Sequence, residues 1–197
     1  MSSPFDDLID ERELAQLRSR YGPFPRHDVR LAMSAGSLAF YRRAFRKRRG
    51  EILFVLQRPD GDLLLHTKHS YPAGVYRLPG GGIERDEPVR HSLAREVLEE
   101  TQFSVADESF LGLIAYEFTG SGPAVRFVSY VFQIPNIRGE PVPLDDSEGI
   151  SDFRWLPPGQ LPEVATVLKN LADDAPGRSD WGRFRAVGHD FVAGLDF

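Results

Sequence analysis

Three glutamates, Glu96, Glu99 and Glu100, lie three and four positions apart in a strongly helical stretch of the chain. Residues at these spacings share one face of a helix, so their carboxylates would stand together and repel one another. A hard divalent cation relieves this repulsion, and magnesium prefers one or two carboxylates together with water and phosphate oxygens. The spacing therefore indicates a metal-binding face. A solvated acidic face paired with nearby arginines is the structural alternative.

A run of glycines, residues 80–82, comes shortly before this helix. Successive glycines can take positive φ angles and let the backbone approach a ligand closely. Pro88 suits the first helical position, where a missing N–H costs nothing, so the glycine loop leads into the helix N-terminus. We expect a separate helical arc to bury against a sheet, and it contains Leu93, Ala94, Val97, Leu98 and Thr101.

The stretch from Leu78 to Phe103 closely resembles the signature of the Nudix hydrolase family. The matching residues are Leu78-Pro79-Gly80-Gly81, Glu87, Arg95-Glu96-Val97-Leu98-Glu99-Glu100-Thr101 and Phe103, and later Arg154-Trp155-Leu156-Pro157. The likeness covers residues 51–172. One position departs from the family, because Gln102 stands where the family has glycine. We expect this residue to end the helix in a left-handed conformation, at a cost of about 1 kcal/mol.

The resemblance implies a hydrolase that cleaves the diphosphate of a nucleoside diphosphate linked to another group, with Mg²⁺ or Mn²⁺ as cofactor. By resemblance, Glu96, Glu99 and Glu100 are the metal ligands, and one of them, Glu96 or Glu99, also orients or deprotonates the attacking water. Metal ions neutralise phosphate charge and acidify bound water. Gly80 and Gly81 are expected to shape the cradle for the metal and the phosphates.

Several residues outside the metal face have expected roles as well. Glu87 and Arg95 are expected to pair and to hold the loop against the helix. Glu148 is the first candidate for a general base and Glu117 the second, with an ordinary surface glutamate as the alternative for each. Two arginines, Arg58 and Arg77, are candidates for binding substrate phosphates, although a surface ion pair explains either residue equally well.

The elements that must position these residues indicate an α/β (α+β) fold, a mixed β-sheet sandwiched between helices. We expect strands at 52–57, 63–68, 75–78, 110–118, 125–134 and 152–156, with the first two joined as a hairpin, and helices at 6–20, 88–101 and 162–172. Residues 37–48 fit either a helix or an arginine-rich strand. The prediction is one domain, residues 1–197, with a core at 51–172, a helical extension at 1–50 and a C-terminal tail at 173–197.

Composition limits the function further. The chain has 197 residues, a net charge of -5 and no cysteine, which excludes disulfides and thiol catalysis. It has no apolar run near the length of a membrane helix and no secretion signal, so we expect a soluble cytoplasmic protein that does not bind membranes. The acidic net charge argues against nucleic acid and favours a small-molecule partner. The basic run 42–49 is either solvated or an anion patch.

Two questions stay open at this level. Family marks for ADP-sugar or dinucleoside polyphosphate substrates are absent, since Phe118 and residues 119–121 occupy their positions. The main alternative to an enzyme is a catalytically silent module of the same fold that senses nucleotides, and a second is an isomerase of a non-nucleotide diphosphate. Residues 181–185 mix aromatics with cations, which suits a packed tail, closure of a site or contact with a second copy in a homodimer.

Overall fold

The computed structural model describes residue 5, residues 8–144 and residues 146–195. Its strands are β1 (Arg26–Ala32), β2 (Arg48–Leu56), β3 (Leu63–Lys68), β4 (Gly80–Glu84), β5 (Ser109–Thr119), β6 (Val125–Ile134) and β7 (Ile150–Leu156). Its helices are α1 (Glu11–Tyr21), α2 (Ala35–Ala44), α3 (Val89–Thr101), α4 (Leu161–Lys169) and α5 (Arg178–Ala193), with short 3₁₀ turns at Phe45–Lys47, Asp146–Glu148 and Pro158–Gln160.

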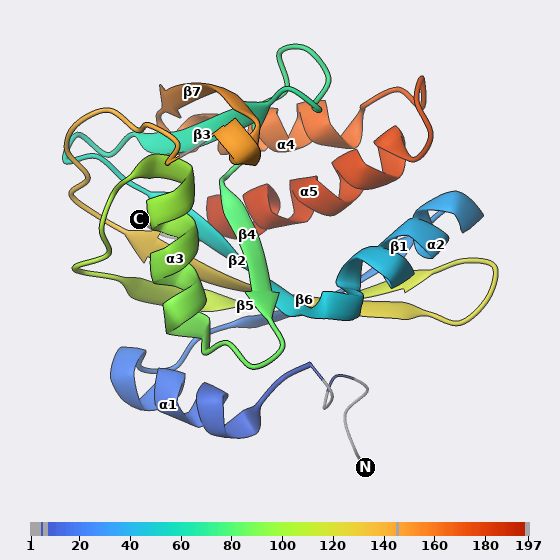
Figure 1. The fold of residues 1–197 in the computed structure, drawn as a ribbon, viewed down its shortest axis with the longest axis horizontal. Helices are drawn as coiled ribbons and strands as arrows, with labels where there is room; N and C mark the ends of the chain where they lie inside the picture. The colour runs from blue at the N-terminus through green and yellow to red at the C-terminus, as the bar shows by residue number, and fades with distance from the viewer. Residues whose placement is uncertain (1–4, 6–7, 145, 196–197) are drawn as a thin grey trace.

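A mixed five-stranded sheet with the order β1-β5-β6-β2-β4 forms the centre of the molecule, and β3 and β7 make a second, two-stranded sheet (Figure 1). Alternate residues of β2 enter two different cores. Phe54 packs in the core that α1 and α3 cover, and Val55 packs in the core that α2 and α5 cover. The expected fold class, a mixed sheet between helices, is therefore confirmed.

The expected hairpin between the strands near residues 52–57 and 63–68 is wrong. β2 pairs with β4 on one side and with β6 on the other, while β3 pairs with β7 in the second sheet. A single bridge between Gln57 and Leu63 is what joins the two segments. The physical reason is that β2 is buried on both faces, so it takes the centre of the sheet and needs two long neighbours.

The expected strand at residues 75–78 is also wrong, because the glycines themselves form β4. Residue 77 makes only an isolated bridge to His66. The ambiguous stretch 37–48 divides into both predicted forms, since α2 and a 3₁₀ turn occupy most of it and Arg48 begins β2. Two elements were not expected at all: the edge strand β1, which pairs in parallel with β5, and the long helix α5 in the tail.

Both terminal segments pack into the central cores. Leu14 and Leu17 of α1 are buried in one core, and Phe184 of α5 is buried in the other. A buried ion pair of 2.8 Å joins Arg185 of α5 to Glu51 of β2, so the tail is tied to the central strand. Within the described part of the chain, none of the helices combines the length and the apolar character that crossing a membrane would need.

Candidate functional site

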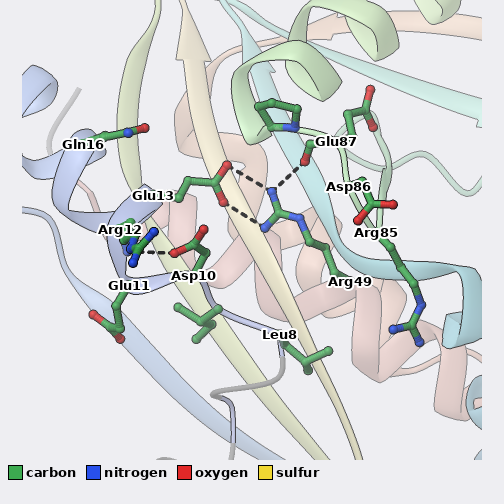
Figure 2. Close-up of a pocket in the computed structure, with 12 residues that line it drawn as sticks. Leu8, Asp10, Glu11, Arg12, Glu13, Gln16, Arg49, Arg85, Asp86 and Glu87 are labelled. Atoms are coloured by element: carbon green, nitrogen blue, oxygen red, sulfur yellow. Dashed lines mark hydrogen bonds and ion pairs between the residues drawn. The ribbon is translucent and has the colours of Figure 1, made fainter.

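The first turn of α3 is capped by a side chain from the N-terminal helix α1. The Val89 amide donates a hydrogen bond to Glu13 Oε1 at 2.7 Å, and Glu13 also pairs with Arg49 at 2.8 Å. Arg49 in turn donates to the Glu87 carbonyl at 2.7 Å. Figure 2 shows Arg49 between Glu13 and Glu87 at the wall of a surface hollow of about 860 Å³. Pro88 was expected to be the first helical residue. It is instead the N-cap residue, one position earlier.

The three glycines of β4 are needed for close packing and not for backbone conformation. The expected positive φ angles are wrong, because none of these three glycines has one. A methyl group on Gly81 would overlap the Glu96 carboxylate, and one on Gly80 would overlap the Ile52 carbonyl. Only glycine therefore lets β4 lie so close to α3 and β2, and the backbone of β4 runs directly beside a predicted metal ligand.

Arg95, in the middle of α3, gathers three carboxylates around its guanidinium. Its Nε and Nη2 atoms each donate to Glu87 at 2.9 Å, and Nη2 also donates to the Gly82 carbonyl at 2.9 Å. Its Nη1 atom donates to Glu96 at 2.8 Å and to Glu99 at 3.0 Å. The expected Glu87–Arg95 ion pair is present, and the oxygens of Glu96 and Glu99 converge on one point.

Lys68 gathers a second set of carboxylates near the C-terminal end of α3. Its Nζ atom lies 2.9 Å from Glu100 Oε1 and 3.0 Å from Glu148 Oε2. His66 Nδ1 lies 3.5 Å from Glu100 Oε2, and the Glu100 side chain is only 1% exposed. The structure thus brings Glu148 beside Glu100. Sequence analysis did not single out Lys68, which lies at the end of an ordinary strand and belongs to no motif.

Burial changes the ionisation of the glutamates on α3. It raises the pKa of Glu96 to about 7, although Arg95 opposes the shift. Burial also raises the pKa of Glu100, and Lys68 offsets only part of that effect. Hydrogen bonds from Arg95 lower the pKa of Glu87. Burial therefore makes the charged forms of Glu96 and Glu100 less favourable in free energy, and a bound cation would stabilise them.

Glu96 and Glu100 belong to the buried side of α3. Of the arc that was expected to bury, Leu93, Val97 and Thr101 are indeed buried, but Ala94 is exposed and Leu98 is 47% exposed. That part of the prediction is wrong. The helix is rotated so that its glutamates lie at the edge of the core, because Gly81 leaves room for a carboxylate there.

The oxygen donors on α3 fit a hard divalent ion in part. Among the residues that the structure describes, no three acidic or histidine side chains are grouped so that they hold a metal together. Glu96 and Glu99 do converge on one cationic nitrogen, and Glu100 Oε2 is buried with no hydrogen-bond partner in the described chain. Carboxylate oxygens are the ligands that Mg²⁺ and Mn²⁺ prefer. Of the three predicted ligands, Glu96 and Glu99 therefore lie close together, whereas the Glu100 carboxylate is paired with Lys68.

The two candidate arginines have different surroundings. Arg77 is buried beside β4, where it donates to the Leu78 carbonyl at 2.9 Å and to the Tyr71 hydroxyl at 2.7 Å. Arg58 pairs with Glu140 at 2.6 Å and lies over the Trp155 ring. Arg77 is thus part of the structure around the glycines, whereas the contacts of Arg58 are to residues outside β4 and α3.

The remaining sequence predictions concern Glu117 and Gln102. Glu117 forms ion pairs with two arginines, Arg30 and Arg126, on β1 and β6. Gln102 caps α3 with φ 58°, and its backbone amide donates to the Leu98 carbonyl at 2.9 Å. The left-handed conformation expected at the departure from the family pattern is therefore confirmed.

Residues 47–177 match the family model described as NUDIX domain. Over 120 residues the chain is 31% identical to an ADP-ribose pyrophosphatase of Methanocaldococcus jannaschii, covering 61% of this chain and 68% of that protein. It is 31% identical over 130 residues to an oxidized purine nucleoside triphosphate hydrolase of Mus musculus, covering 66% and 74%. It is 29% identical over 129 residues to the NAD-capped RNA hydrolase NudC of Vibrio atlanticus, covering 62% of this chain but only 45% of that relative.

Proposed function

The chain belongs to the NUDIX domain family, and we propose that it is a Mg²⁺- or Mn²⁺-dependent pyrophosphohydrolase. Its substrate would be a nucleoside diphosphate linked to another group, cleaved at the phosphoanhydride bond. One observation carries the proposal: Glu96 and Glu99 direct their carboxylates at a single point beside the backbone of β4. The named relatives act on different nucleotide compounds. The choice of substrate within this class must therefore be argued from the chain's own residues.

In this proposal Glu96, Glu99 and Glu100 hold the metal. The bound ion would neutralise phosphate charge and acidify a water molecule. Glu148 would serve as general base toward that water, since Lys68 holds its carboxylate next to Glu100. Glu96 or Glu99 would orient the same water. Glu87 and Arg95 keep the preceding loop against α3.

The diphosphate would lie along the glycine strand. Gly81 is partly exposed there, whereas Gly80 is buried against β2. Arg77 brings a positive charge next to the strand, since it donates to the Leu78 carbonyl and to the Gly80 carbonyl. Because Arg58 is paired with Glu140, we expect it to contribute less to binding than Arg77.

A metal-dependent hydrolysis screen over nucleoside diphosphate derivatives tests the proposal, with a phosphatase present to release inorganic phosphate from the two monophosphate products. Glu99→Gln and Glu100→Gln should each lower the rate by at least about 100-fold, because each removes a charge that acts on the reacting phosphate. Glu163→Gln is the matched control, since Glu163 lies exposed on α4, and it should keep full activity. Inactivity of the native chain on every compound, or full activity of both α3 variants, would contradict the proposal.

The same screen separates the alternative, a module that binds nucleotides without cleaving them. One observation favours that alternative: Arg95 and Lys68 already neutralise the predicted ligands. A silent module would bind nucleotides without cleaving them at any metal concentration. In a hydrolase, added Mg²⁺ would reversibly replace Arg95 and Lys68 as the partners of these glutamates, and the chain would cleave the nucleotide.

A further inference from the structure

A second hollow, of about 640 Å³, lies where α2, the β3–β4 loop and the segment before α5 meet. Four aromatic side chains line it: Phe40 and the buried Tyr41 from α2, Tyr71 from the loop and Trp181 from α5. The rings of Tyr71 and Trp181 are 4.9 Å apart between centroids, and Phe40 is 54% exposed. Hollows of this size with aromatic walls are typical of small-molecule sites.

The walls of this aromatic hollow are fixed to one another. The Ser34 amide, at the start of α2, donates a hydrogen bond of 2.9 Å to Asp180 of α5. Asp180 is buried and also pairs with Arg183. The Ser34 hydroxyl accepts from the Ser37 amide and so caps α2. Because the bond from Ser34 to Asp180 joins α2 to α5, the hollow is preformed, which lowers the entropic cost of binding a ligand.

Tyr71 connects the aromatic hollow to the proposed catalytic residues. Arg77, which bonds the main chain of the glycine region, donates to the Tyr71 hydroxyl at 2.7 Å. The Tyr71 and His66 rings are 6.1 Å apart between centroids, and His66 lies 3.5 Å from the Glu100 carboxylate. A single imidazole therefore separates one wall of the hollow from a predicted metal ligand.

We propose that Phe40, Tyr71 and Trp181 bind the nucleobase of the substrate. Flat aromatic groups stack on such side chains whatever their hydrogen-bonding pattern, and the serine hydroxyls of the rim can bond the edge of a base. The inference rests on the proposed function and deepens it, because it selects a nucleotide over a non-nucleotide diphosphate. Phe40 and Trp181 lie outside the family match at 47–177, so the subsite is built by elements of this chain beyond the matched domain.

Tryptophan fluorescence tests the nucleobase site without any hydrolysis. The chain has two tryptophans, and Trp155→Phe leaves Trp181 as the sole reporter. Titration of this variant, free of metal, uses the 5′-monophosphates of adenosine, guanosine, cytidine and uridine. At least one should quench Trp181 saturably. Phe40→Ala should weaken that binding by about tenfold, as loss of a stacking ring does. Val167→Ala, at another exposed apolar residue, is the matched control and should bind as before.

The outcomes separate the nucleobase site from the hydrolytic proposal. Saturable quenching that depends on Phe40 supports the site even if the chain hydrolyses nothing. Absence of quenching by all four monophosphates, or quenching that Phe40→Ala leaves unchanged, overturns it. In a chain that does hydrolyse nucleotides, Phe40→Ala should raise KM by about tenfold with kcat retained. An unchanged KM overturns the site while the hydrolytic proposal stands. Unfolding midpoints of the variants establish that each remains folded.

Discussion

Two different cations hold the acidic residues of α3. In the middle of the helix Arg95, with a side chain 34% exposed, bonds Glu87, Glu96 and Glu99 at once. At the C-terminal end Lys68 bonds Glu100, whose side chain is only 1% exposed. A guanidinium has five donors in a rigid plane and can serve several carboxylates, whereas an ammonium is a compact point charge.

This difference shows where the larger energy lies. Water still reaches the Arg95 cluster and screens its charges, so each of its pairs contributes little by itself. Glu100 is shielded from water, and burial raises its pKa. Removing its partner would leave an uncompensated buried charge, which is among the costliest single changes in a protein. The Lys68 end is therefore expected to respond more strongly to mutation than the Arg95 end.

The largest effect should come from Lys68→Met. Without the ammonium, the buried Glu100 carboxylate loses its nearest compensating charge and keeps only the more distant Arg77. The free energy of unfolding of the metal-free chain should therefore fall by about 3 kcal/mol. The pKa of Glu100 is already raised in the folded state, so the charged form is the penalised one. The loss should therefore grow as pH rises from about 5 to about 8. Urea unfolding at several pH values measures it.

A double variant controls for lost packing at Lys68. Lys68→Met with Glu100→Gln removes the buried charge as well as its partner, and it should recover most of the lost stability. If the double variant is as unstable as Lys68→Met alone, electrostatics at Glu100 is not the cause.

Arg95→Lys, in the middle of α3, should lower the free energy of unfolding by about 2 kcal/mol. A lysine keeps the charge but cannot donate to Glu87, Glu96 and Glu99 together. The loop before α3 should loosen, and the rate of hydrolysis should fall with it. Arg90→Lys is the matched control, because Arg90 is an exposed residue of the same helix, and it should change stability by less than about 0.5 kcal/mol. Equal effects of the two variants would contradict a special role for Arg95.

Acid should weaken the Arg95 end through Glu87. Hydrogen bonds from Arg95 lower the pKa of Glu87 in the folded state. Its ion pair therefore contributes stability above the unfolded-state pKa, and this contribution is lost as pH falls through the folded-state pKa. The stability difference between the native chain and Glu87→Gln should shrink by about 1 kcal/mol from about pH 7 to about pH 3. A constant difference across these pH values would exclude the pair as its source.

The smallest effect should come from the end of α3 itself. Gln102 adopts a left-handed conformation with φ 58°, which glycine takes without strain. Gln102→Gly should therefore stabilise the chain by about 0.5 kcal/mol, since loss of the exposed bond from Gln102 to the Pro143 carbonyl offsets part of the gain. Thermal unfolding measures the change, and a lowered melting temperature would show that the Pro143 bond dominates.

Sequence patterns determined the local parts of this protein. The helix that carries Glu96, the strands β3 and β6, and the left-handed residue Gln102 were all predicted from short segments. Periodicity and backbone preferences act within one element or between near neighbours, so these features needed no knowledge of the rest of the chain. The Glu87–Arg95 ion pair was expected as well, from the resemblance to the family signature.

Only the tertiary structure decided which distant segments meet. The neighbours of β2 follow from burial of both its faces, which the turn at residues 59–62 does not reveal. The separation of Glu100 from Glu96 and Glu99 depends on Lys68, and the cap of α3 depends on Glu13 in the first helix. Each of these contacts joins residues far apart in the chain. The spacing of three glutamates thus predicted a shared face, but packing against other strands determined which cation each carboxylate meets.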